Sequence, residues 1–139
     1  MSPNKNKQKG TRWENELVEL LNKNIPGADA RRVAGSGALG TTLNEPLLQA
    51  DIVVKFPGVN KKFRIEAKCG YGGAKQLTVK REWLNKVKGE AENSYAYPAL
   101  AGKFMDARKA DGVKYFVIMD LDSFCDIIRY MGNLPVRDE

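Results

Sequence analysis

The chain has 139 residues, of which 42% are hydrophobic, so we expect one folded α/β domain with a real core. It contains no histidine, which excludes Ser-His and Cys-His nucleophilic catalysis and nearly all catalytic zinc sites. Lys and Arg number 23 against 17 Asp and Glu, and the net charge of +6 points to a polyanionic partner, nucleic acid before a membrane.

The amino-terminal residues predict an arm followed by a helix. Residues 1–10 are polar and basic, and we expect a flexible arm that contacts phosphates, with one domain over residues 11–139. Thr11 and Glu14 fit a capping box for a helix that runs to about Asn24. Glu14 also leans toward the buried side of this helix, so the pattern leaves a capping role and a catalytic role open.

A short strand is predicted over residues 30–34, followed by a glycine-rich stretch at 35–40. This stretch spells GxGxxG, but a dinucleotide-binding unit needs a crossover helix before its next strand, and a strand already begins near Asp51. We therefore expect no organic cofactor. The loop beside Arg31 and Arg32 is better explained as a surface that contacts the nucleic-acid backbone.

Residues 50–56 and 61–69 predict a hairpin with a short turn at 57–60. Centring the turn places Asp51 opposite Glu66, where like charges destabilise a sheet unless a cation is present. The same register pairs Val53 with Arg64, Lys55 with Lys62, Ile52 with Ile65, and Val54 with Phe63. One face of the hairpin is then apolar and the other charged.

Lys68 shares the charged face with Asp51 and Glu66, because side chains alternate along a strand. Oxygen-only ligation by carboxylates suits Mg²⁺ or Mn²⁺, and the lysine would orient an attacking water. The alternative is that Glu66 and Lys68 form an ordinary solvated pair.

A second helix is predicted from the spacing of Val79, Trp83, Val87 and Ala91, with Lys86 and Lys88 on a solvated face. Strands are predicted at 98–105 and 114–121, the latter in a central or well-covered place because it is almost entirely apolar. A last, short helix is predicted after the second of these strands, with Ser123 and Asp126 as its cap. Its apolar stripe is formed by Phe124, Ile127, Ile128 and Met131. The order α-β-β-β-α-β-β-α gives a mixed central sheet flanked by helices.

The chain has no apolar stretch near 18 residues and no signal-peptide pattern, so we expect an intracellular, cytoplasmic protein without a membrane partner. If the source is viral, the expected location is the host cytoplasm. Cys69 and Cys125 are expected to be reduced thiols.

Four elements in order carry a resemblance to a known family. They are Gly10 to Glu14 followed by Leu17, the stretch Arg32 to Ser36, the strand start at Asp51, and Ile65 to Lys68. In these residues the chain resembles the PD-(D/E)xK nuclease superfamily, and within it the archaeal-type Holliday junction resolvases, which also occur in phages.

The resemblance implies a restriction-endonuclease-like core and a Mg²⁺-dependent, structure-selective endodeoxyribonuclease, with Mn²⁺ as a substitute. It implies that Glu14, Asp51 and Glu66 bind the metal and that Lys68 positions the attacking water. It also implies a homodimer that cuts four-way DNA junctions. The residues expected to contact DNA are Lys5, Lys7, Lys9, Arg12, Arg31, Arg32 and Ser36.

The chain departs from the resolvase pattern in a longer segment at 37–49 and a glycine-rich connection after Lys68. Two alternatives therefore stay open: a nuclease for flaps, nicks, single strands or restriction-like sites, and a non-catalytic DNA-binding protein. Gln76 is either an accessory site residue or a surface glutamine.

Overall fold

The computed structural model describes residues 5–33, 52–70 and 75–136, with side chains from residue 10 onward in the first segment. The described strands form one mixed sheet in the order β1-β2-β3-β4-β5. The elements are α1 (Lys5–Asn24), β1 (Asp29–Arg32), β2 (Ile52–Lys55), β3 (Lys62–Cys69), α3 (Arg81–Asn93), β4 (Ala96–Lys103), the 3-10 turn η2 (Lys109–Asp111), β5 (Tyr115–Ile118) and α4 (Leu121–Met131). This sequence of elements confirms the predicted order.

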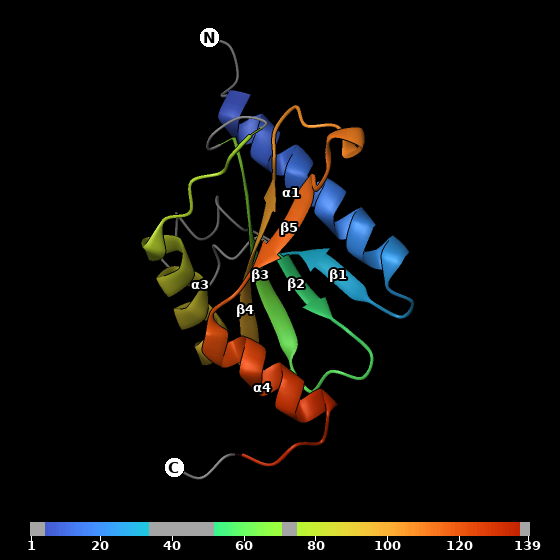
Figure 1. The fold of residues 1–139 in the computed structure, drawn as a ribbon, viewed down its shortest axis with the longest axis vertical. Helices are drawn as coiled ribbons and strands as arrows, with labels where there is room; N and C mark the ends of the chain where they lie inside the picture. The colour runs from blue at the N-terminus through green and yellow to red at the C-terminus, as the bar shows by residue number, and fades with distance from the viewer. Residues whose placement is uncertain (1–4, 34–51, 71–74, 137–139) are drawn as a thin grey trace.

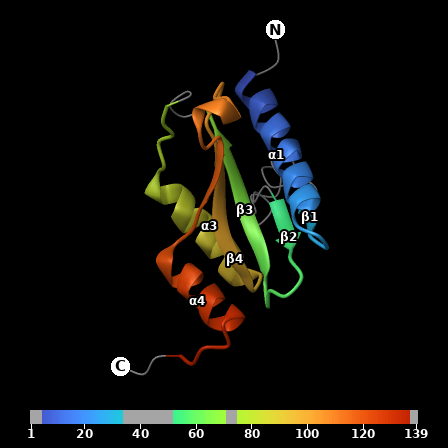
Figure 2. The same cartoon turned by 45° about the vertical axis from the view of Figure 1, so that its right-hand side comes forward.

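Helices α1 and α3 cover opposite faces of the sheet, and α4 crosses its lower end (Figures 1 and 2). The larger core lies under α1, where Trp13 and Leu17 meet the apolar face of β1 to β4. A smaller core lies under α3 and joins Trp83, Val87 and Leu100. No helix among the described residues has the length and apolar character that spanning a bilayer requires.

Helix α1 begins at Lys5, earlier than the sequence predicted. The polar segment from residue 5 to residue 10, expected to belong to the arm, is therefore helical. Thr11 and Glu14 lie inside the helix, so the predicted capping box is wrong. A helix start is difficult to see in this sequence because the first turns carry only polar residues, and the apolar stripe begins at Trp13.

The hairpin register is confirmed at three of the predicted pairs. Val53 pairs with Arg64, Ile52 with Ile65, and Val54 with Phe63. Ile52 and Val54 are fully buried, as expected for the apolar face. Strand β1 pairs antiparallel with β2, and its bounds lie close to the predicted 30–34. The glycine-rich stretch 35–40, with Ser36, and the strand start at Asp51 lie outside the described residues.

The prediction of a central or well-covered last strand is wrong. Strand β5 is the edge strand next to β4, and Val117 on it is 58% exposed. The buried central position belongs to β4, which pairs in parallel with β3 and is buried at every residue except Lys103. A strongly apolar run does not show by itself that a strand is central or covered, because it does not fix the order of strands in the sheet.

The start of α4 also differs from the prediction. The cap is Asp120, whose carboxylate accepts a hydrogen bond from the Ser123 backbone N–H at 3.1 Å. Ser123 lies inside the helix, and Asp126 accepts a hydrogen bond from the Tyr97 hydroxyl at 2.7 Å. Of the apolar stripe predicted on this helix, only Ile127 is buried.

Candidate active site

Glu66 is the most deeply buried charged side chain of the predicted site, with 4% of the residue exposed. It lies in the middle of β3, paired with Leu100 of β4, on the face that α3 covers. Its Oε1 lies 3.6 Å from Nζ of Lys68 and 3.2 Å from Nζ of Lys86. Its Oε2 is buried and has no hydrogen-bond partner within residues 5–33, 52–70 and 75–136. A buried carboxylate oxygen without a partner is costly, and a cation bound there would remove that cost.

Lys68 is fixed by an aromatic ring as well as by Glu66. Its ammonium lies 4.5 Å from the ring centre of Trp83, which α3 presents to the sheet. The side chain is only 21% exposed. The attraction between an ammonium group and the face of a tryptophan ring offsets part of the free energy that the ammonium group loses when it leaves water. The sequence motif thus places the lysine beside the carboxylate, and α3 holds it there.

Lys86 is a site residue that the sequence analysis missed. The expectation of a solvated face is wrong for both lysines of α3, because Lys86 reaches Glu66 and Lys88 lies 3.4 Å from Asp120. Two features of the sequence could have indicated a buried position for Lys86. It directly precedes Val87 of the apolar stripe, and Glu90 follows Lys86 at the i+4 position. The pattern did not show which strand residue the helix would meet.

Glu90 adds a second buried acid under α3. It is 3% exposed, and its Oε1 has no hydrogen-bond partner. Burial raises the pKa of Glu90, Lys86 and Arg64 oppose that shift, and the charge of Glu66 adds to it. The cluster under α3 is therefore two carboxylates with the ammonium groups of Lys68 and Lys86 near them.

Glu14 lies on the other face of the sheet, on the same helix as Trp13. Its side chain is 13% exposed, and Oε2 lies 3.7 Å from Arg32 of β1. Burial raises the pKa of Glu14, and the guanidinium of Arg32 partly offsets this effect. Because α1 begins at Lys5, Glu14 is too far along the helix to cap it.

The structure brings together only part of the predicted ligand set. Glu66 and Lys68 meet, whereas Glu14 contacts Arg32 and no contact joins it to Glu66 among the described residues. The described ranges contain no group of three or more acidic, Cys or His side chains that could hold a metal ion. Asp51 lies outside these ranges, directly before Ile52, and its pairing with Glu66 stays a prediction.

The predicted DNA-contacting residues are found in different places. Arg12 is exposed on α1, and Arg32 is 42% exposed at the end of β1. Arg31 is 77% exposed and bonds both carboxylate oxygens of Asp29. Lys5, Lys7 and Lys9 belong to α1, and their side chains and all of Ser36 lie outside the described part. Gln76 is exposed in the segment before α3.

The sheet has helices on both faces and carries the buried Glu-x-Lys on β3, where the lysine lies beside the carboxylate. A family model described as "Phage putative PDDEXK endonuclease" matches residues 5–136. The chain belongs to this family.

The solved structures similar to the chain include the 1.6 Å structure of Archaeoglobus fulgidus Hjc, a Holliday junction resolvase from an archaeal hyperthermophile. The two are 22% identical, the match covers 93% of this chain and 99% of that chain, and the TM-score is 0.48. No curated protein matches the chain.

Proposed function

We propose that this endonuclease is Mg²⁺-dependent and structure-selective, and that it hydrolyses phosphodiester bonds in four-way DNA junctions as a homodimer. The observation that carries the metal-dependent chemistry is Glu66, a buried carboxylate with one unpartnered oxygen and two lysines on the other. A charged carboxylate of this kind destabilises an ordinary hydrophobic core, because removing a buried ion from water costs on the order of several kcal/mol.

The donor set fits Mg²⁺, with Mn²⁺ as a substitute. Glu14, Asp51 and Glu66 offer only carboxylate oxygens, which are the ligands that these hard cations prefer. The free Oε2 of Glu66 and the raised pKa of Glu14 both show carboxyl groups that a nearby cation would stabilise in the charged form. When bound, the metal would supply Lewis-acid stabilisation of the phosphate and lower the pKa of a water.

The lysines of the cluster have separate tasks in this proposal. Lys68 holds the attacking water in line, because Trp83 and Glu66 fix its ammonium. Lys86 is 37% exposed and stands at the outer side of Glu66, so it can pass from the carboxylate to a DNA phosphate oxygen. Arg12, Arg31 and Arg32 would bind phosphates nearby, in line with the net charge of +6.

Support for a junction substrate comes from the sequence motifs, whose order from Gly10 to Lys68 resembles that of the archaeal-type resolvases. A symmetric pair of sites would cut paired strands of a junction, because each site meets an equivalent strand. Flap, nick or single-strand cleavage would keep the same chemistry with a different shape of DNA. A non-catalytic DNA-binding protein would bind without cutting.

A cleavage panel tests the proposal. Purified protein is incubated with four-way, flap, duplex and single-stranded DNA, each with Mg²⁺ and with EDTA, beside the variants Glu66→Gln and Asp51→Asn. We expect paired nicks in the four-way junction with Mg²⁺ only, and binding without cleavage in both variants. Preferred cleavage of another DNA would refute the four-way junction as the substrate. Cleavage in EDTA would refute the dependence on metal, and an active Glu66→Gln variant would refute the site.

A further inference from the structure

Helix α4 carries a narrow apolar stripe that is exposed. Leu121, Phe124, Ile128 and Met131 are 72%, 50%, 46% and 63% exposed. Their spacing of three, four and three residues is the a/d pattern of a helix that packs along one seam against another helix. Within its own fold, α4 buries only Ile127. The stripe, called here the α4 seam, therefore has no covering element among the described residues.

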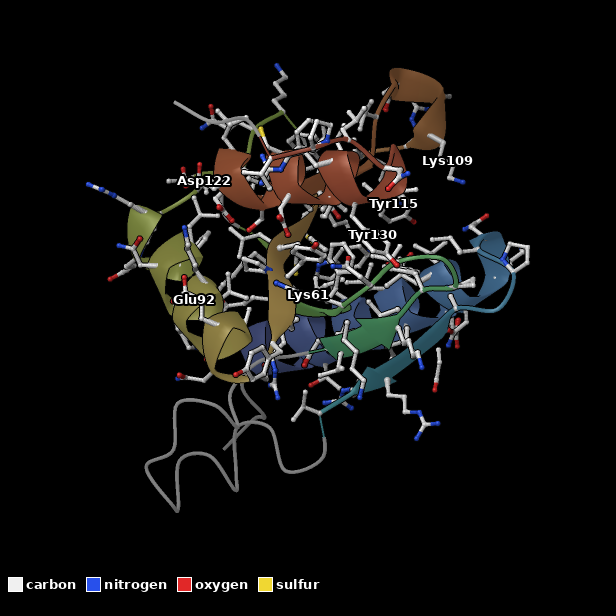
Figure 3. The ribbon with its side chains drawn as sticks, turned by 90° about the horizontal axis from the view of Figure 1, so that it is seen from below. Lys61, Glu92, Lys109, Tyr115, Asp122 and Tyr130 are labelled. Carbon is white, nitrogen blue, oxygen red and sulfur yellow. The ribbon has the colours of Figure 1, made fainter. Side chains whose placement is uncertain are left out.

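The seam is not suited to nucleic acid. The charged residues of α4, which are Asp122, Asp126 and Arg129, fall outside the a/d positions, and Arg129 is paired with Asp126 at 3.2 Å. No cation therefore lies on the seam to meet a phosphate. Figure 3, a view from below, shows the helix with Asp122 in its first turn and Tyr130 in its last. An apolar partner of the same shape fits the seam best.

The amount of exposed apolar surface agrees with a protein partner. Nine large apolar side chains from Val113 to Val136 are exposed, counting only the part of the chain that the structure describes. The four side chains of the seam, at on the order of 100 Å² each, together expose roughly 400 Å² of apolar surface. An exposed apolar patch of a few hundred Å² often marks an interaction surface.

We infer that the α4 seam is the contact between two copies of this chain, packed helix to helix around a two-fold axis. A two-fold contact uses the same patch on both copies, and a stripe of Leu, Phe, Ile and Met is complementary to itself. The inference deepens the proposed function, since it rests in part on the homodimer and names its interface. It also places the contact on the helix that follows the edge strand β5, whereas the Glu66 cluster lies between β3 and α3.

Sedimentation equilibrium of the full chain tests the interface without DNA or metal. The wild type is compared with Ile128→Glu and Leu121→Glu on the seam, and with Tyr130→Glu as the matched control. Tyr130 is 51% exposed on the same helix but lies off the seam, beside a cavity of about 290 Å³. We expect a wild-type dimer, a dissociation constant raised at least about tenfold in both seam variants, and little change in the control.

A wild-type monomer would overturn the inference, and so would a dimer that persists in Leu121→Glu. Thermal melting of each variant checks folding. Because the Leu121 side chain is largely in water, its variant decides the question if Ile128→Glu does not fold. A dimer without nuclease activity would refute the proposed function alone. Junction cleavage by a protein whose seam variants stay dimeric would refute the seam alone.

Discussion

The ammonium of Lys86 lies 3.2 Å from Oε1 of Glu66, closer than the 3.6 Å of Lys68, the lysine of the Glu-x-Lys motif. The carboxylate thus has one lysine from its own strand and one from α3. Both ammonium groups neutralise part of the negative charge of Glu66, the charge with which a carboxylate binds a metal ion. If Glu66 binds a metal as proposed, the two ammonium groups oppose that cation in the absence of DNA and can pair with a phosphate when DNA binds.

Removal of the α3 lysine should make metal binding tighter. For Lys86→Met we expect Mn²⁺ affinity to rise roughly fivefold, because a positive charge near the ligand opposes the metal by about 1 kcal/mol in a well-solvated setting. Titration calorimetry without DNA measures this. Lys88→Met is the matched control, since Lys88 contacts Asp120 and not Glu66. Unchanged or weaker Mn²⁺ binding in Lys86→Met would contradict the arrangement.

Replacing Glu14 tests whether this residue has a catalytic role or only a structural one. With Glu14 inside α1, Glu14→Gln removes no cap, so the free energy of unfolding at neutral pH should not fall by the 0.5–2 kcal/mol, roughly, that a lost cap costs. We expect a folded protein without cleavage activity. Denaturant unfolding and junction cleavage are measured on the same preparation. A variant that is fully active would remove Glu14 from the site.

The buried acid Glu90 predicts a pH effect on stability. Its pKa is raised above the ordinary 4.5 by burial, so the folded state holds this proton at pH values where the unfolded state has released it. Folding therefore loses stability as the pH rises from the unfolded pKa through the folded pKa. Glu90→Gln should match the wild type below pH 4.5 and be more stable by about 1 kcal/mol at neutral pH.

Chemical unfolding of wild type and Glu90→Gln across a pH series measures this difference. A difference that shrinks as the pH rises would show that the lysines around Glu90 outweigh its burial. Glu92→Gln is a suitable control, because Glu92 is exposed near the end of the same helix.

Part of this architecture could be predicted from the sequence. The hairpin register follows from the turn and the alternation of side chains, so Val53 meets Arg64 as expected. The contact between Lys86 and Glu66 could not be predicted, because it depends on how α3 crosses the sheet. Likewise, the edge position of β5 depends on the pairing order of strands, which an apolar run does not contain.

Gly102 of β4 provides a test of packing near the site. It pairs with Lys68, and the ring of Phe116 on β5 lies where a Cβ atom would stand. Gly102→Ala should therefore lower the free energy of unfolding by about 1–3 kcal/mol, because the ring must move. Gly89→Ala is the matched control: a Cβ there meets nothing within 4 Å, and the helix should gain about 0.5–1 kcal/mol. Urea unfolding of both variants compares them, and equal stabilities would refute the close packing.

The basic surface should bind DNA by charge and shape and not by base sequence. Arg32 is 42% exposed at the end of β1, with its guanidinium 3.7 Å from Glu14, so it can bind a phosphate while it stays beside the site. Arg32→Ala should weaken binding to every junction sequence by a similar factor, since phosphate contacts carry no sequence information. Loss of one contact should also reduce the slope of log affinity against log salt by about 0.9.

Fluorescence anisotropy with junctions of three sequences across a salt series measures both effects, in EDTA so that no DNA is cut. Arg31→Ala is the matched comparison, because Arg31 is 77% exposed but already bonded to Asp29. Its guanidinium is already held by both carboxylate oxygens of Asp29 and is less free to bind a phosphate, so we expect a smaller loss of affinity than for Arg32. A loss confined to one junction sequence would mean that the protein recognises bases. An affinity that does not change with salt would mean that Arg32 does not bind a phosphate and acts only through Glu14.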